Sequence, residues 1–360
     1  GGCGCGVLLG RGGSLRSERR SGAAPAGSGG RPARLAGGGG GGRVTRAKRP
    51  GSLGLLEDAV IRLAGIQRTA FPRLDHKLVV VVCADNGVTA EGISPSAPTV
   101  TAAQAVNFAR GGGTINAFAR RLGAPVRVVD VGIATPYTHE GVERRTVRRG
   151  TDNMAAGPAM SAADCRRAVE VGITLAEEAA ASGAQLLIPG EMGIGNTTSS
   201  SAVAAVLLQK PPEEITARGA GAPERVAHKA AVIRKALDVN RPCPADPLDV
   251  LAKVGGLDIA ALCGLYIGAA ACGLTAMLDG VISCTAALAA VRLAPAVQEY
   301  LLPSHCSAER VGSLLLEALD KKPRITAGLC LGEGTGGVVG AALLDYALAA
   351  YEQVVGIDEI

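Results

Sequence analysis

The sequence predicts an α/β fold in which helices cover both faces of a parallel β-sheet. Two observations support this prediction. Short, continuous runs of Val, Ile and Leu recur along the chain, and longer stretches with helical spacing separate them. Continuous apolar runs are typical of strands that are buried on both faces, and parallel strands need crossover connections of the kind that helices provide.

The elements follow in order from these patterns. A first helix is expected at Leu53–Gln67, where Leu56, Val60 and Leu63 lie on one helical face. The expected strands are Leu78–Cys83, Val126–Val131, Gln185–Pro189, Thr275–Leu278 and Ile325–Leu331. The expected helices between them are Val100–Arg121, Ala162–Ser182, Thr197–Leu208 and Glu224–Leu237.

One segment, Ile259–Leu278, has twenty residues without a charge and is long enough to span a bilayer. However, it consists mostly of Ala, Gly and Cys, and it is flanked by Asp258 and Asp279 without Trp or Arg/Lys anchors. We therefore expect a buried helix that runs into a strand, and no membrane partner.

The composition suits a compact domain with its own core, because 48% of the 360 residues are hydrophobic and 19% are charged. Eight aromatic residues, none of them Trp, argue against a stacking platform for nucleic acid. The net charge of +5 is unevenly distributed: residues 1–49 carry +9, which leaves −4 for residues 50–360. No nucleic-acid partner is therefore expected.

Residues 1–47 form a Gly/Arg-rich leader that we predict to be disordered, and residues 48–360 form the folded domain. The first 42 residues contain 17 glycines and cannot bury enough apolar surface to offset the cost of ordering. An Arg-rich, acid-poor leader fits an organellar transit peptide. A cloning or start-site artefact is the preferred interpretation, because no amphipathic period is present.

The cysteines and histidines do not indicate a metal site. The ten cysteines include no C-x-x-C pair, and the four histidines are widely scattered. We interpret the cysteines as small core residues of a protein in a reducing compartment, which favours a cytoplasmic location. No metal and no cofactor are expected.

Polar, glycine-rich loops follow the predicted strands, and ligands of parallel sheets bind in such loops. In the loop Gly190–Thr198 a strand, a Gly-rich turn and a helix follow one another, an order that favours phosphate binding at the helix N-terminus. Asn196 stands where a nucleotide triphosphatase loop requires Lys, which disfavours that class. A tight turn with a helix cap explains the same residues.

A second loop, Leu331–Gly337, places Glu333 between glycines. Small neighbours allow a ligand to approach the backbone, and a partly desolvated Glu acquires a raised pKa that suits a general base. A surface Glu in a turn is the alternative interpretation of this loop.

These segments together resemble the nicotinate-nucleotide–dimethylbenzimidazole phosphoribosyltransferase family, in order over nearly all of residues 48–360. The segments that carry the resemblance include Lys48–Glu57, Asp85 with Glu91–Ser94, Gly157–Met160, Gly190–Thr198, Leu278–Gly280, Ser304–Glu309 and Leu331–Gly336. The resemblance implies a Rossmann-like parallel sheet and a homodimer. It also implies a small helical lobe, from about residues 48–75 and the C-terminal helices.

The resemblance further implies transfer of ribose 5-phosphate from nicotinate mononucleotide to 5,6-dimethylbenzimidazole, which gives nicotinate and α-ribazole 5′-phosphate. Glu333 then corresponds to the general base. Glu191, on the other loop, stabilises the cationic sugar or orients the ribose hydroxyls, and a purely structural role is the alternative interpretation. Lys229 corresponds to a phosphate-binding point charge, although a solvated helix face explains it as well. The residues expected to bind substrate are Asp85, Ser94, Gly193, Gly195, Asn196, Lys229, Ser304, Ser307, Gly332, Gly334 and Thr335.

Two alternatives remain open. Asn86 stands where many members of the family have His, and Gln104 only approximates the position of an azole-contacting Gln, so a related transferase could use another azole or a purine. A non-catalytic nucleotide or azole binder is the other alternative. It would require the loss of Glu333 or of the phosphate loop, and both are present.

Overall fold

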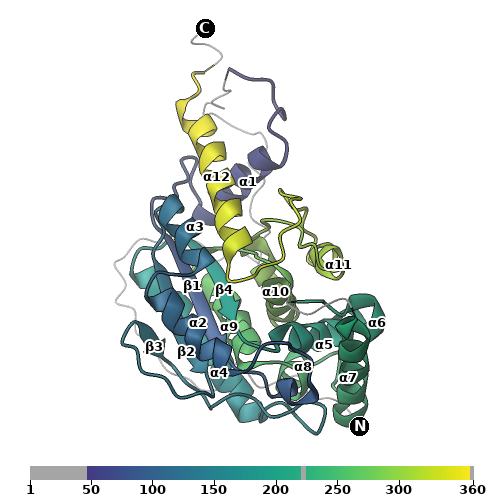
Figure 1. Ribbon diagram of the computed structural model, residues 1–360. Helices are drawn as coiled ribbons and strands as arrows, with labels where there is room; N and C mark the ends of the chain where they lie inside the picture. Colours follow the sequence, from purple (N-terminus) through teal and green to yellow (C-terminus); the bar gives the residue numbers. More distant parts are fainter. Residues whose placement is uncertain (1–46, 220–223, 357–360) are drawn as a thin grey trace, which may run out of the picture. The chain divides into compact units, whose positions relative to one another are not determined.

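The computed structural model describes residues 47–219 and 224–356, and in this part of the chain a six-stranded parallel sheet forms the centre of the fold (Figure 1). Its strands are β1 (Lys77–Ala84), β2 (Val126–Gly132), β3 (Val142–Arg144), β4 (Leu186–Met192), β5 (Thr275–Met277) and β6 (Leu301–Leu302). Every pair of neighbouring strands is parallel, which confirms the predicted α/β class.

The strand order is β3-β2-β1-β4-β5-β6, so the chain builds outward from β1 in one direction and from β4 in the other. Strands β1 and β4 are paired along their lengths, with Val82 opposite Glu191 and Cys83 opposite Met192. The strand order reverses between β1 and β4, and ligands of open α/β sheets bind at the carboxyl ends of the strands at such a point.

Helices pack on both faces of the sheet, and their side chains divide into two hydrophobic cores. The first core is formed by α4 (Ala162–Ala181), α5 (Asn196–Leu208), α6 (Pro212–Ile215), α7 (Arg225–Asn240), α8 (Pro247–Val254), α9 (Leu257–Ala271), α10 (Val281–Leu293) and α11 (Gly312–Ala318). The second is formed by α1 (Leu55–Gln67), α2 (Thr99–Ala109), α3 (Thr114–Leu122) and α12 (Thr335–Gln353). Two 3₁₀ helices, Gly87–Glu91 and Pro295–Tyr300, complete the elements.

Strand β1 shows how the sequence divides the two cores. Val80 and Val82 belong to the first core, whereas Val79, Val81 and Cys83 belong to the second, because successive side chains of a strand point to opposite faces. All five side chains are fully buried. Full burial of one such Val side chain contributes about 1.5–3 kcal/mol to the stability of the fold. Because both faces of the strand are buried, its apolar residues form a continuous run and do not alternate with polar ones.

Helices α4 and α9 cross closely at two glycines. A Cβ atom on Gly172 would lie 1.9 Å from the carbonyl oxygen of Ala261, and one on Gly264 would lie 1.9 Å from that of Val169. Only glycine permits the two backbones to touch at these points. The close contact anchors α9, whose first turn carries a buried acid of the site, Asp258, against the long helix α4.

Most predicted elements are confirmed within one to three residues, and the segment Ile259–Leu278 is a buried helix followed by β5, as expected. No described helix combines the length and the apolarity that a membrane crossing requires. Two elements differ from prediction. The stretch Val100–Arg121 is not one helix but two, α2 and α3, which are separated at Gly111–Gly113. Gly111 has a φ of +80°, a conformation that ends a helix.

The strand predicted at Ile325–Leu331 is wrong. Only Ile325 forms a bridge, with His305, and the segment is otherwise an irregular loop. Its apolar residues do not face a core, since Leu331 is 57% exposed, and Gly328 with a φ of +68° interrupts an extended path. The sixth position in the sheet is taken by the short strand β6.

Helices α1 and α12 pack against each other beside one end of the sheet, as Figure 1 shows. The small helical lobe expected from about residues 48–75 and the C-terminal helices includes this pair, and its independence as a lobe stays a prediction. The predicted leader, residues 1–47, lies outside the described residues except for its last member.

Candidate active site

Two acids lie at the carboxyl ends of β1 and β4. Asp85 directly follows β1, and Glu191 lies near the end of β4. The carboxylate of Asp85 accepts the backbone N–H of Ala134 through Oδ2 at 2.8 Å, and burial raises its pKa. Asp85 therefore helps to fix the loop after β2 beside the end of β1.

Glu191 is buried, with 7% of its surface exposed, and it is joined to a second buried acid by Asn196. The side-chain amide of Asn196 donates one hydrogen bond to Oε2 of Glu191 and another, of 3.0 Å, to Oδ2 of Asp258. Burial, and then the charge of Asp258, raises the pKa of Glu191 to about 8. Burial likewise raises the pKa of Asp258 to about 6. At neutral pH the side chain of Glu191 therefore keeps its proton in most molecules.

The loop that carries Glu333 lies directly on β4. A Cβ on Gly190 would lie 2.2 Å from the carbonyl oxygen of Glu333, and one on Gly332 would lie 2.6 Å from Oε1 of Glu191. Glycine at these two positions allows the loop that carries Glu333 to touch β4, the strand that carries Glu191. Glu333 itself has a φ of +63°, which costs of order 1 kcal/mol or more for a non-glycine residue.

The carboxylate of Glu333 is half-buried, and its Oε2 accepts the backbone N–H of Ile115 at 3.2 Å. Burial raises its pKa, while this hydrogen bond acts in the opposite direction. The side chain is therefore held by the start of α3 and remains open enough to meet a ligand. The sequence predicted that Glu333 lies between glycines in a loop. It did not predict the contact of its carboxylate with the start of α3.

Asp279, which the sequence analysis did not select, anchors the same loop. Its Oδ2 accepts the N–H of Gly334 at 3.1 Å, and its Oδ1 accepts the N–H of Gly337 at 2.9 Å. The residue follows β5 and caps the N-terminus of α12 from another segment of the chain. Its position directly after a predicted strand was the signal that could have identified it.

A cationic group forms the other part of the site, at the start of α5. Lys229 from α7 is 3% exposed, and its Nζ donates to the carbonyl oxygen of Arg218 at 2.7 Å and to Oγ1 of Thr197 at 3.3 Å. Gly195, with a φ of +95°, is the N-cap of α5, and Gly193 packs against the end of β1. Burial lowers the pKa of Lys229. The alternative interpretation of Lys229, a solvated helix face, is wrong, because this side chain is buried.

The hydroxyl groups of the remaining predicted residues form hydrogen bonds with neighbouring residues. Ser304 is buried, and its Oγ donates to the carbonyl oxygen of Leu278 at 2.5 Å and lies 2.9 Å from Nδ1 of His305. The hydroxyl oxygens of Ser94 and Ser307 accept backbone N–H groups of Ser96 and Glu309, respectively. The hydroxyl of Thr335 donates to the carbonyl oxygen of Gly332 at 2.7 Å and so closes the Glu333 loop. Among the described residues, none of the three serine hydroxyls bonds to Glu191, Glu333 or Lys229.

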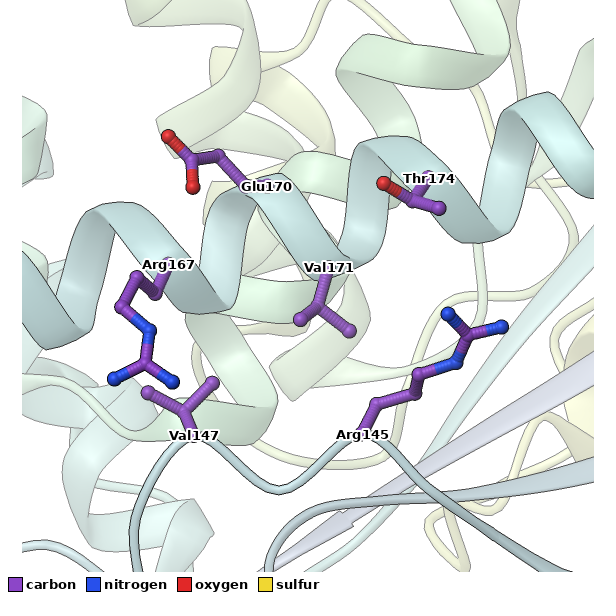
Figure 2. Close-up of a pocket in the computed structure, with 6 residues that line it drawn as sticks. All are labelled: Arg145, Val147, Arg167, Glu170, Val171 and Thr174. Carbon is purple, nitrogen blue, oxygen red and sulfur yellow. The ribbon is translucent and has the colours of Figure 1, made fainter.

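A pocket on the outer side of α4 does not belong to this site. Figure 2 shows two of its residues, Arg145 and Val147, on the loop after β3 and the others on one helix. Arg145 is already paired with Glu143 and Glu178. No predicted site residue lines this pocket. Within residues 47–219 and 224–356, no group of three or more His, Cys, Asp or Glu side chains is placed to hold a metal ion.

Comparisons with known proteins identify the family of this chain. A family model described as phosphoribosyltransferase matches residues 43–359. A nicotinate-nucleotide–dimethylbenzimidazole phosphoribosyltransferase of Acetivibrio thermocellus is 47% identical over 305 residues, which are 84% of this chain and 87% of the relative. The protein of the same name from Desulforudis audaxviator is 48% identical over 301 residues, which cover 83% and 85% of the two chains.

A solved structure shares the fold. The crystal structure of CobT from Thermus thermophilus superposes with a TM-score of 0.82 at 41% identity, and the match covers 85% of this chain and 92% of that one. A family match over most of the chain, with relatives of this similarity, establishes membership. The chain belongs to the phosphoribosyltransferase family whose curated members are named nicotinate-nucleotide–dimethylbenzimidazole phosphoribosyltransferases.

Proposed function

We propose that this protein transfers ribose 5-phosphate from nicotinate mononucleotide to 5,6-dimethylbenzimidazole and releases nicotinate and α-ribazole 5′-phosphate. The observation that carries the proposal is the half-buried Glu333, held on the glycine-rich loop beside Glu191 and β4. The names of relatives that are 47–48% identical point to the same pair of substrates.

Proton balance requires one base in this reaction. Nicotinate is bound to the ribose through a pyridinium nitrogen, so it leaves with the bonding electrons and needs no proton donor. The benzimidazole nitrogen attacks C1 of the ribose with inversion, and the other azole nitrogen loses its N–H proton. We assign that proton to the carboxylate of Glu333, whose burial-raised pKa makes it a stronger base than an exposed Glu.

We assign a different role to Glu191. With a pKa raised to about 8, its carboxyl group is mostly protonated at neutral pH and offers an O–H donor as well as an acceptor. This supports hydrogen bonding to the ribose hydroxyls, the second of the two roles expected for it. Asn196 and Asp258 hold the side chain in a fixed orientation for that contact.

The phosphate of the nucleotide fits the cationic part of the site. The start of α5 brings the positive end of the helix dipole to this place, and Lys229 brings a buried charge to Thr197 in its first turn. Replacement of Lys229 by Met is expected to raise the KM for nicotinate mononucleotide about tenfold or more. Replacement of the exposed Lys235 on the same helix is the matched control.

We also propose that the protein is a homodimer and acts in the cytoplasm. Large apolar side chains are exposed on the adjoining α1 and α12 and next to them: Ile61, Phe71 and Tyr346 are each more than half exposed. A second copy of the chain would cover them. Light scattering coupled to size exclusion tests this, and a monomer at micromolar concentration would exclude the dimer. Cysteines that are free in the described part of the chain support a reducing compartment.

The activity is tested directly with the purified chain, nicotinate mononucleotide and dimethylbenzimidazole. Nicotinate and α-ribazole phosphate should form in equal amounts between about pH 7 and 9, where carboxylate bases are ionised. The absence of both products over this range would exclude the transferase. Adenine and other azoles, assayed in parallel, test the alternative of a related transferase with another base.

A further inference from the structure

A buried threonine connects the turn before α5 to a helix on the other face of the sheet. Thr101 lies in the first turn of α2 and is fully buried. Its Oγ1 accepts the backbone N–H of Ile194 at 3.1 Å. Ile194 is the central residue of the turn 193–195, which joins β4 to α5. Because α2 belongs to the second core and α5 to the first, this hydrogen bond joins elements from the two faces of the sheet.

The same hydroxyl group interacts with Asp85, which directly follows β1. Burial raises the pKa of Asp85, and the hydroxyl of Thr101 acts in the opposite direction because it stabilises the carboxylate. A hydroxyl group has one proton to donate and lone pairs that accept. With its proton directed to Asp85, the oxygen of Thr101 offers its lone pairs to the N–H of Ile194. The hydroxyl therefore has one preferred orientation, which the end of β1 helps to fix.

The turn that Thr101 holds directly precedes the phosphate site proposed above. In this turn the N–H of Asn196 donates to the carbonyl oxygen of Gly193 at 3.1 Å. Among the residues that the structure describes, no group accepts the N–H of Gly195 or that of Thr197. These two amides lie at the start of α5, where the helix dipole favours an anion. Their directions depend on the conformation of the turn, which the hydrogen bond to Thr101 restricts.

We propose that Thr101 is a positioning residue for the phosphate of the nucleotide: its hydroxyl fixes the turn 193–195 so that the amides of Gly195 and Thr197 are available to the phosphate. The identity of the ligand rests on the proposed function. Thr101 does not touch the substrate itself, because it is fully buried, and it acts through the backbone of Ile194. A turn that is fixed before binding favours affinity, since the amides need no reordering when the phosphate arrives.

The test measures binding of inorganic phosphate to the full chain by calorimetry, without turnover. Thr101→Val keeps the shape of the side chain but removes its hydroxyl, so the N–H of Ile194 loses its acceptor. We expect phosphate to bind about fivefold or more weakly, which corresponds to the loss of one hydrogen bond. The KM for nicotinate mononucleotide should rise by a similar factor, whereas kcat at saturating nucleotide should change much less, because Glu333 lies on another loop.

Two further variants separate positioning from a general structural role. Thr101→Ser keeps the hydroxyl and should bring the phosphate affinity and the KM close to the values of the parent. Thr285→Val makes the same change at a buried threonine of α10 whose hydroxyl has no hydrogen-bond partner among the described residues. This matched control should change neither constant.

A Thr101→Val variant with the phosphate affinity and the KM of the parent would overturn the proposal. A Thr101→Ser variant that binds phosphate as weakly as Thr101→Val would do the same, because the hydroxyl would then not be the group that matters. Thr101→Cys provides another variant if Thr101→Val unfolds, since a thiol is a weaker acceptor than a hydroxyl. We expect its phosphate affinity to lie below that of the parent, and an equal affinity would count against positioning.

Failure of this proposal is distinguishable from failure of the proposed function. Weaker phosphate binding in Thr101→Val, with a parent chain that forms no α-ribazole phosphate, would retain the positioning role and exclude the transferase. Normal turnover with parent-like phosphate binding and KM in Thr101→Val would retain the transferase and exclude the positioning role. A parent chain that binds no phosphate would overturn the positioning role, and the turnover assay would then decide on the transferase alone.

Discussion

Asn196 links Asp258 to Glu191 through a single side-chain nitrogen, which lies 3.0 Å from Oδ2 of Asp258 and also donates to Oε2 of Glu191. Both carboxyl groups are buried, and the charge of Asp258 disfavours ionisation of Glu191. Their pKa values separate, to about 6 for Asp258 and about 8 for Glu191. The amide thus holds the carboxylate of Asp258 and the protonated carboxyl group of Glu191 in one fixed arrangement at neutral pH. One site can therefore supply both a hydrogen-bond donor and a negative charge.

The raised pKa of Glu191 predicts a pH dependence of stability. Between its ordinary value of 4.5 and about 8, the native state holds a proton that the unfolded chain has released. The free energy of unfolding should therefore fall as pH rises, by at most about 1.4 kcal/mol per pH unit from this group, and level off above pH 8. Asp258 adds to the slope only up to about pH 6.

Urea unfolding at pH 6, 7 and 8 checks this prediction. Glu191→Gln keeps an acceptor for Asn196 and carries no titratable proton, so its stability should fall less steeply over this range than that of the parent. Glu170→Gln, at an exposed position on α4, should follow the parent curve. Equal slopes for the parent and Glu191→Gln would mean that Glu191 is ionised in the native state.

Glu333→Gln should abolish most turnover and leave substrate binding intact. The amide oxygen of Gln still accepts the N–H of Ile115, but it cannot take the azole proton. We expect kcat to fall by about 10²- to 10⁴-fold and the KM for nicotinate mononucleotide to change less than about threefold. Nicotinate release measured under saturating substrates decides the point. A variant as fast as the parent would remove the base assignment.

The two hydrogen bonds that Asp279 accepts at the start of α12 lead us to expect a link between the stability of this helix and catalysis. Asp279→Asn keeps one acceptor for the two N–H groups of Gly334 and Gly337, so one of them loses its partner. The expected loss is about 1–2 kcal/mol in the free energy of unfolding, together with slower turnover, because Glu333 directly precedes this cap. Urea unfolding and amide hydrogen exchange at Gly334 and Gly337 measure it. Asp238→Asn on the exposed face of α7 should have no such effect, and an Asp279→Asn variant with parent-like exchange would show that the cap is dispensable.

The sequence predicted the parts of the fold that local pattern determines. Strands β1 and β4 were identifiable because both faces of each are buried, which requires a continuous apolar run. Strands β3 and β6 have three and two residues, too few for any periodic signal. Ile325–Leu331 has the composition of a strand, but burial decides the outcome, and Leu331 faces solvent.

In the candidate site, too, local sequence predicted some residues, whereas others depend on contacts between distant segments. Glu191, Glu333 and Asn196 were identifiable because they stand in glycine-rich loops near the ends of apolar runs. Asp258 and Asp279 act on residues 55 to 62 positions away, through contacts that exist only when β4, β5 and α9 are assembled. Lys229 was expected from family resemblance, but its burial against Arg218 depends on how α7 packs and leaves no local pattern.

The contact of Gly190 with the Glu333 loop gives a final prediction. A methyl group at Gly190 would meet the carbonyl oxygen of Glu333 at 2.2 Å, and this neighbour is backbone rather than a flexible side chain. The loop must therefore shift away from β4. Gly190→Ala is expected to lower the free energy of unfolding by about 1–3 kcal/mol and to reduce kcat sharply, because Glu333 moves with its backbone.

Gly157→Ala separates this steric effect from the general effect of replacing glycine. A methyl group at Gly157 meets no atom within 4 Å, and the residue does not have a positive φ. This control should be neutral or more stable by up to about 1 kcal/mol, because alanine restricts the unfolded chain. If Gly190→Ala keeps the turnover of the parent, then the position of Glu333 does not depend on its contact with β4, and α3 and Asp279 suffice to hold the base.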